Sequence, residues 1–147
     1  MKLTSKSRYA VTAMLDVAFN SQLEPVSLAD IAQRQHISLA YLEQLFMKLR
    51  QQLLVKSIRG PGGGYLLNRA LDEISIGHII DAVGDEVEVT KCQGQANCQQ
   101  GQQCLTHSLW CELTDQLRQY LYGMNLAELM RKQSILSVIE RQSQHPK

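Results

Sequence analysis

The stretch LLVKSIRGPGGGYLL, residues 53–67, constrains the fold of this chain more than any other. Its centre, residues 60–64, is made only of glycine and proline, which interrupt helices and favour tight turns. Most of the flanking residues are apolar, β-branched or aromatic, and such residues favour extended backbone. The stretch therefore predicts a β-hairpin, with strand-like residues 53–59, a Gly/Pro tip, and a return strand at Tyr65, Leu66 and Leu67.

Two capped helices are predicted directly before this hairpin. Ser27 followed by Asp30 is typical of a helix start, here of the short helix LADIAQRQ with Leu28, Ile31 and Ala32 facing inward. The residues HIS form a turn, and Ser38 can cap a second helix, LAYLEQLFMKLRQQ. The predicted buried stripe of that helix is Leu42, Leu45, Phe46 and Leu49. Two helices joined by a short turn are common in proteins, but this layout is also that of a helix-turn-helix.

The N-terminal residues have a charged start and then an apolar stretch, as in a secretory signal. Asp16 interrupts the apolar stretch, however, and no small-residue cleavage site follows. The apolar residues of 7–20 also recur at helical spacing, which predicts an amphipathic helix with one wide buried face. No apolar run approaches the length of a membrane span. We therefore expect a cytoplasmic protein with no membrane partner.

A helix-turn-helix followed by a basic hairpin predicts a winged helix that binds double-stranded DNA. Residues 1–70 have a net charge of +5 and the remainder −4, so only the first half favours a polyanion. We expect Arg59 to enter a narrow A·T-rich minor groove. A flexible turn and a phosphate-binding loop are the alternatives, the latter weakened because no Lys-Ser or Lys-Thr follows the glycines. The predicted DNA contacts are Ser38, Ala40, Tyr41, Glu43 and Gln44 of the recognition helix, and Lys56, Arg59 and Gly60 of the wing.

The segment CQGQANCQQGQQCLTH, residues 92–107, predicts a metal centre. Cys92, Cys98, Cys104 and His107 follow the spacing C-x5-C-x5-C-x2-H, which lacks the paired knuckles of most structural zinc sites. Thiolates select soft centres: zinc, cuprous copper or an iron–sulfur cluster. The wide, even gaps suit a loop around something larger than one ion. The alternative is a set of unmetallated thiols on a flexible loop, able to form a disulfide under stress.

The residues after this loop predict a long amphipathic helix. Leucines recur every four residues, a stripe that predicts a twofold dimer or else packing against the chain's own domain. Cys111 lies one turn after His107; we expect it to be a small apolar residue in a packed face, with a reserve metal ligand as the alternative. The predicted dimerisation residues are Leu105, Leu109, Leu113, Leu117 and Leu121.

No acid–base pair and no nucleophile with its base is visible in the sequence, so we do not expect an enzyme. Three classes of protein fit the features above: a cluster-sensing transcriptional regulator, a DNA-binding protein with structural zinc, and an iron–sulfur carrier or electron-transfer protein. The predicted architecture is mostly α: a winged helix-turn-helix domain with a small hairpin (1–82), a linker and cluster loop (83–104), a dimerisation helix (105–124) and a C-terminal helix or tail (125–147).

Four motifs together resemble one family, the IscR iron–sulfur cluster regulators, which are bacterial winged-helix transcription factors. These motifs are LTSKSRYAVTAMLDVA, SLAYLEQLF, RGPGGGYLL and the run CQG…C…CLTH, and the likeness extends to about residue 130. Two positions depart from the family: Ala40 stands where a serine is common, and Cys111 where a thiol is unusual. Relatives that sense nitric oxide or cysteine share the fold, but His107 and Glu43 together argue against them.

The resemblance implies a 2Fe-2S cluster on Cys92, Cys98, Cys104 and His107, supplied by the iron–sulfur assembly machinery. It also implies a homodimer that binds pseudo-palindromic promoter sites and represses its own assembly operon when the cluster is bound. The cluster-free form would bind a second class of site. Glu43 would discriminate between the two classes, because a carboxylate accepts a hydrogen bond from cytosine and repels phosphate.

Overall fold

The structure is a computed structural model that describes residues 3–144; residues 1–2 and 145–147, the ends of the predicted first and last segments, lie outside it. Seven α-helices, one short 3-10 turn and one two-stranded sheet make up this part of the chain. In chain order they are α1 (Ser5–Asn20), α2 (Leu28–Gln35), α3 (Leu39–Gln51), β1 (Val55–Ile58), β2 (Gly64–Leu67), η1 (Leu71–Glu73), α4 (Ile76–Ala82), α5 (His107–Gly123), α6 (Leu126–Met130) and α7 (Gln133–Ser143).

Both predicted serine caps open the helices assigned to them. Ser27 Oγ accepts the backbone N–H of Asp30 at 3.1 Å, and Ser38 Oγ accepts that of Tyr41 at 3.1 Å. Each cap satisfies an N–H that has no partner within its helix. Between the helices, His36 ends α2 in the left-handed conformation, with φ of 56°, and turns the chain toward α3. The predicted helix-turn-helix is therefore confirmed.

The hairpin forms where the glycine-rich stretch predicts it. Strands β1 and β2 pair antiparallel, with Val55 opposite Leu67 and Ile58 opposite Gly64. The backbones of Val26 and Tyr65 also exchange two hydrogen bonds of 3.0 and 2.8 Å, which attach the hairpin to the segment before α2. A side chain at Gly64 would collide with the Val26 carbonyl, so this close approach requires glycine. The fold is thus a winged helix-turn-helix, as expected.

One hydrophobic core lies between α1, α3, α4 and the hairpin. The predicted stripe of α3 is buried in it, together with the inner faces of α1 and α4 and with Leu126 of α6. α6 is joined to the segment before α4 by two backbone hydrogen bonds of 2.9 Å, from Ile76 to Met124 and from Leu126 to Ile74. The C-terminal end of α5 is therefore held on the core. The largest fully buried side chains of α1, α3 and α4 are Met14, Val17, Leu42, Leu45, Phe46, Leu49 and Ile79.

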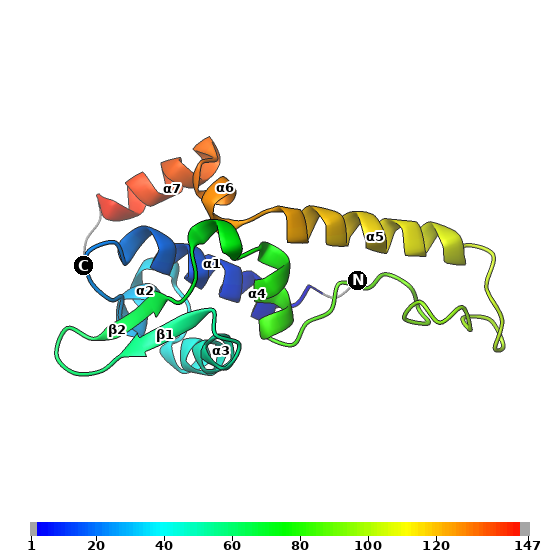
Figure 1. Cartoon of the computed structure of the whole chain (residues 1–147), viewed down its shortest axis with the longest axis horizontal. Helices are drawn as coiled ribbons and strands as arrows, with labels where there is room; N and C mark the ends of the chain where they lie inside the picture. The colour runs from blue at the N-terminus through cyan, green and yellow to red at the C-terminus, as the bar shows by residue number, and fades with distance from the viewer. Residues whose placement is uncertain (1–2, 145–147) are drawn as a thin grey trace.

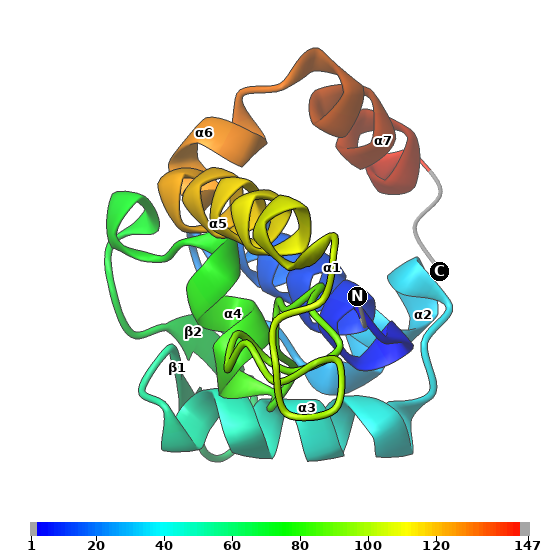
Figure 2. The same ribbon diagram turned by 90° about the vertical axis from the view of Figure 1, so that its right-hand side faces the viewer.

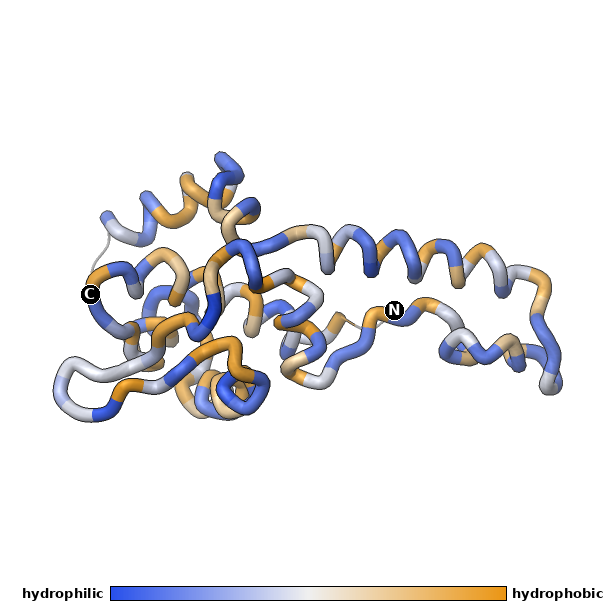
Figure 3. The backbone as a smooth tube through the Cα atoms, viewed as in Figure 1, coloured by the Kyte–Doolittle hydropathy of each residue, from blue (hydrophilic) through white to orange (hydrophobic). Residues whose placement is uncertain are grey.

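α5 extends from this core, and the cysteine loop runs along it to its far end (Figure 1). Seen along its axis, α5 passes over α1 and α4, and the loop lies at the near end (Figure 2). Polar and apolar residues alternate along the helix as in an amphipathic helix (Figure 3). Among residues 3–144, no helix combines the length and the apolar character that crossing a bilayer requires.

The predicted leucine stripe is divided in the structure. Leu117 and Leu121 pack against the core of their own chain, whereas Leu109 and Leu113 are 53% and 40% exposed. Leu105 is 98% exposed and lies before α5 begins, so its assignment to the helix was wrong. The cause is geometric: a four-residue spacing drifts by about 40° at each step of a 3.6-residue helix. The five leucines therefore cannot share one narrow face.

Candidate metal centre and nucleic-acid interface

The cysteine loop is a series of tight turns. The backbone N–H of Gln95 donates to the Cys92 carbonyl at 3.2 Å, and Gln99 and Gln102 exchange two backbone hydrogen bonds of 2.8 Å. Three non-glycine residues of the loop have positive φ: Gln93, Ala96 and Gln100. Because each of these left-handed residues turns the chain sharply, the small and polar residues between the cysteines fold the loop back on itself.

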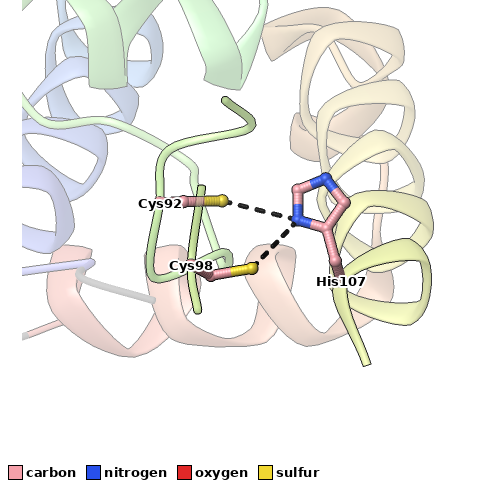
Figure 4. Close-up of side chains that lie close together, drawn as sticks. All are labelled: Cys92, Cys98 and His107. Carbon is pink, nitrogen blue, oxygen red and sulfur yellow. Dashed lines mark hydrogen bonds between the residues drawn. The ribbon is translucent and has the colours of Figure 1, made fainter. Parts of the chain in front are cut away.

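Two of the cysteines and the histidine converge on one point (Figure 4). Nδ1 of His107 lies 3.4 Å from Sγ of Cys92 and 3.6 Å from Sγ of Cys98. One potential ligand atom from each of the three residues lies within 4.8 Å of the others. His107 is buried and comes from the first turn of α5, whereas both cysteines come from the loop. The helix thus presents a fixed nitrogen to two sulfurs.

The third predicted cysteine, Cys104, is not part of this group of three but lies next to it. Its backbone N–H donates to Sγ of Cys98 at 3.1 Å. Cys98, Cys104 and His107 also line a cavity of about 440 Å³, which Thr90 and Trp110 help to close. All four predicted ligands therefore lie around one small region, with Cys104 at its edge.

Hydrogen bonds distribute the protons unequally among the three thiols. Burial raises the pKa of Cys92, but the backbone amides of Ala96, Gly94 and Asn97 outweigh this effect and lower it to about 6. A hydrogen bond from Cys98 lowers the pKa of Cys104 and, as its counterpart, raises that of Cys98. Because thiolates are the species that bind metal, the lowered pKa values of Cys92 and Cys104 favour these two thiols as ligands.

A polar network joins the start of the loop to α5. The Glu88 carboxylate accepts hydrogen bonds from Thr90 and from Thr114 and pairs with Arg118 at 3.5 Å. The hydrogen bond from the Thr90 hydroxyl is the main cause of the lowered pKa of Glu88. Thr90 Oγ1 in turn accepts the backbone N–H of Gly94 at 2.7 Å, two residues beyond Cys92. The position of Cys92 is therefore tied to the long helix.

The two residues of this network on α5, Thr114 and Arg118, were not predicted from the sequence. Cys111, Thr114 and Arg118 follow His107 at intervals of four, three and four residues, so all four lie on one face of the helix. Residues 87–89, which precede the cysteine loop, contact this face at Thr114 and Arg118. Sγ of Cys111 is partly buried and lies 3.2 Å from Nε2 of His107, a polar contact that the expectation of a small apolar packing residue did not include. Helical spacing of polar residues was the signal that would have identified the face.

The predicted DNA-contacting residues share one side of the molecule. α3 and the hairpin lie on the same side, opposite α6 and α7, in both views (Figures 1 and 2). All but one of the predicted contacts are exposed: Ser38, Ala40, Glu43, Gln44, Lys56, Arg59 and Gly60. Gly60 has φ of +95°, which only glycine adopts readily, and it forms the tip of the wing.

Tyr41 differs from the other predicted contacts because it is half-buried. Its ring packs edge-on against the ring of Tyr9 in α1, with centroids 5.6 Å apart. This packing contributes to the join between α1 and α3, so Tyr41 has a structural role whether or not its hydroxyl reaches DNA. Tyr9 is 40% exposed at the same place and was not among the predicted contacts.

Known proteins of related sequence are transcriptional regulators. The chain is 56% identical over 145 residues to the HTH-type transcriptional regulator IscR of Citrobacter koseri, covering 99% of this chain and 89% of that protein. It is 57% identical, with the same coverage, to the regulator of that name from Klebsiella pneumoniae strain 342. The resemblance drawn from the four motifs is thereby confirmed.

Solved structures of regulators have the same fold. CymR, described as the global cysteine regulator of B. subtilis, superimposes with a TM-score of 0.78 at 33% identity, over 88% of this chain and 95% of that one. IscR of T. potens superimposes with a TM-score of 0.73 at 31% identity, over 100% and 93% of the two chains.

The family model that matches this sequence spans residues 3–132, from α1 to the residues after α6, and describes iron-dependent transcriptional regulators. This match covers the winged helix, the cysteine loop and the long helix together. The chain belongs to the Rrf2 family of transcriptional regulators.

Proposed function

We propose that this chain is a cytoplasmic, homodimeric transcriptional regulator that holds a 2Fe-2S cluster on Cys92, Cys98, Cys104 and His107. The observation that carries the proposal is the approach of His107 Nδ1 to within 3.4 and 3.6 Å of two cysteine sulfurs. The curated relatives are named IscR, and the family is described as iron-dependent.

The donor set fits an iron–sulfur cluster. Three thiols and one imidazole are soft to intermediate donors, and an imidazole can replace a thiolate ligand of such a cluster. The lowered pKa values of Cys92 and Cys104 favour ligation near neutral pH. The adjoining cavity of about 440 Å³ leaves room for a group larger than one ion. When bound, such a cluster supplies a centre that responds to iron supply and oxidants.

The chain's own residues suggest how occupancy of the loop affects DNA binding. Glu88, Thr90 and Thr114 connect the residues around Cys92 to α5, and the far end of α5 packs on the winged-helix core. A ligand that orders the loop would bias the placement of α5 and hence the spacing of two recognition helices in a dimer. A differential stabilisation of about 1–2 kcal/mol is enough to change site choice measurably.

DNA binding is assigned to α3 and the wing. In this proposal α3 enters the major groove, and Arg59 reaches the adjacent minor groove. Glu43, exposed on α3, discriminates between two classes of promoter site because its carboxylate accepts from cytosine and repels phosphate. Double-stranded DNA, a second copy of the chain and the assembly machinery that donates the cluster are the proposed partners.

The experiment compares DNA binding by cluster-loaded, cluster-free and Cys98→Ala protein over a panel of promoter fragments, including that of the iron–sulfur assembly operon. Anaerobically purified protein is expected to be reddish-brown, with iron and sulfide in equal amounts. Cys98→Ala should lose cluster-dependent site choice and keep the binding of the cluster-free form. Colourless protein with one zinc would indicate a structural-zinc DNA-binding protein instead. A coloured protein with no promoter preference would indicate an iron–sulfur carrier.

A further inference from the structure

The ring of His107 is contacted by sulfur on both of its edges. On the loop side, Nδ1 faces Cys92 and Cys98. On the opposite edge, Nε2 lies 3.2 Å from Sγ of Cys111, within hydrogen-bonding range for sulfur. His107 and Cys111 are one turn apart on α5, whereas the other two cysteines belong to the loop. The contact on Nε2 is therefore independent of the conformation of the loop.

A histidine that offers one nitrogen to a metal centre depends on what holds the other nitrogen. The group on the far nitrogen sets the orientation of the ring and determines which nitrogen keeps the proton. Such partners are usually carboxylates or backbone carbonyls. Here the neighbour of Nε2 is a thiol, which both donates and accepts hydrogen bonds. The Cys111 contact therefore persists with the ring proton on either nitrogen.

We propose that Cys111 is a positioning residue for His107, fixing the imidazole so that Nδ1 faces the sulfurs of Cys92 and Cys98. Cys111 acts through His107 and is not itself a cluster ligand, because its sulfur meets the nitrogen that faces away from the other cysteines. The inference rests on the proposed function only in taking His107 as a ligand. The contact itself is a property of the cluster-free chain.

The first test uses cluster-free protein and the ring-nitrogen NMR resonances of ¹⁵N-labelled histidine. Cys111→Ala should shift both ring nitrogens of His107, because Nε2 loses its partner. Cys111→Ser, which keeps a group that donates and accepts, should restore values close to those of the unmodified protein. His78 is the internal control, since its Nδ1 accepts the backbone N–H of Ser75 far from the loop. Unchanged His107 resonances in Cys111→Ala, or equal shifts in both variants, would overturn the proposal.

The second test uses anaerobically loaded protein and follows the visible spectrum and the rate of cluster loss. Loss of the partner of a metal-bound histidine typically costs on the order of 10- to 100-fold in metal affinity. We therefore expect Cys111→Ala to assemble a cluster with an altered spectrum and to lose it about 10-fold faster, with Cys111→Ser near the unmodified rate. Identical spectra and lifetimes in all three proteins would contradict a positioning role.

Failure of the proposed function gives a different result. If the unmodified protein forms no cluster at all, the assignment of the ligands fails, yet the resonances of His107 still decide whether Cys111 holds its ring. Far-ultraviolet circular dichroism of all three proteins checks that α5 has remained helical, so that an altered resonance is not the result of unfolding.

Discussion

The backbone N–H of Val89 donates to Oγ1 of Thr114 at 3.0 Å, joining the segment before the cysteine loop to the middle of α5. Thr114 is 3% exposed, and its hydroxyl also donates to Glu88. One side chain therefore satisfies a backbone amide and a carboxylate at once. It is the most buried link between the loop and the long helix, because Arg118, the other α5 residue of the network, is exposed.

Replacing Thr114 by valine keeps the shape of the side chain and removes both hydrogen bonds. The Val89 amide would lose its partner at a site that water reaches poorly, which typically costs about 1–3 kcal/mol. We expect the free energy of unfolding to fall by about 2 kcal/mol and the Val89 amide to exchange its hydrogen faster. Thr114→Ser, which keeps the hydroxyl, is the control, and equal stability of all three proteins would rule out the link.

Asp16 and Arg34 form a buried ion pair between α1 and α2. The Asp16 carboxylate is fully buried and lies 2.7 Å from Nη2 of Arg34, with Nε at 3.0 Å. Gln35 also donates to it at 2.8 Å. The hydrogen bond to Asp16 is the main cause of the raised pKa of Arg34.

Replacing Arg34 by methionine should be more damaging than its half-buried position suggests. The Asp16 carboxylate would remain buried without its cation, and breaking a buried pair in this way typically costs about 3–5 kcal/mol. We expect a loss of about 3 kcal/mol in urea unfolding, since two amide side chains still donate to the carboxylate. Arg34→Lys keeps the positive charge but cannot make both hydrogen bonds to the carboxylate. Its free energy of unfolding should lie between those of the unmodified protein and Arg34→Met. If Arg34→Met lowered the free energy of unfolding by less than about 0.5 kcal/mol, as is usual for a surface substitution, the ion pair would not be essential for stability.

Local signals explain why so much of the winged helix was predictable. Ser27 and Ser38 cap helices through bonds to residues three positions away, and the glycines of residues 60–64 determine a turn within a few residues. Such signals act between residues that are close together in the sequence. The same is true of the cysteine spacing, which predicted the ligands but not the convergence of Cys92, Cys98 and His107. The convergence depends on left-handed turns at Gln93, Ala96 and Gln100, and no pattern of side chains in the sequence predicts these turns.

Hydrogen-bond and ion-pair partners that are distant in the sequence could not be predicted from it. Asp16 was interpreted only as an interruption of an apolar stretch, because its partner lies 18 residues away on another helix. Glu88 and Thr90 lie in an irregular segment and meet α5 only after folding. In each case a polar group was paired by tertiary structure.

Asp85 should make the free energy of unfolding depend on pH in the acid range. It ties the end of α4 to the start of α1, accepting hydrogen bonds from Ser7 and Thr4 and pairing with Lys6 at 3.4 Å. Burial raises its pKa, but the hydrogen bonds from Ser7 and Thr4 outweigh burial, so that the pKa is lowered overall. A carboxyl with a lowered folded-state pKa stabilises the protein above its unfolded pKa of about 3.9. That stabilisation is lost as the pH falls through the folded-state value.

The variant Asp85→Asn should therefore be less stable than the unmodified protein at neutral pH, and the difference should shrink as the pH falls below about 4. Urea unfolding of both proteins between neutral pH and about pH 3 measures this difference. Glu86, exposed and adjacent, provides the control, because Glu86→Gln should leave the acid limb unchanged. A stability difference between Asp85→Asn and the unmodified protein that is constant over the whole range would contradict the assignment.

Arg59, at the end of the strand that leads into the tip of the wing, should contribute to the salt dependence of DNA binding. Each phosphate neutralised by a cation adds about 0.9 to the slope of log affinity against log salt. We expect Arg59→Ala to weaken binding and to reduce this slope by about 1. The control is Arg131→Ala, which should leave the slope unchanged. Arg131 is exposed directly after α6, and α6 lies opposite α3 and the hairpin (Figures 1 and 2). An unchanged slope in Arg59→Ala would remove Arg59 from the interface.

The two groups of leucines on α5 should respond differently to substitution. Leu117 packs on the core of its own chain, so Leu117→Ala should lower the melting temperature by an amount that does not depend on protein concentration. Leu113 is exposed in the single chain, and a charge there should disrupt only a contact with a second copy. A dimer melts at a temperature that rises with protein concentration. We therefore expect Leu113→Glu to abolish this rise, with sedimentation showing a monomer, while Leu117→Ala retains it. A Leu113→Glu protein that remains dimeric would place the dimer contact elsewhere on the chain.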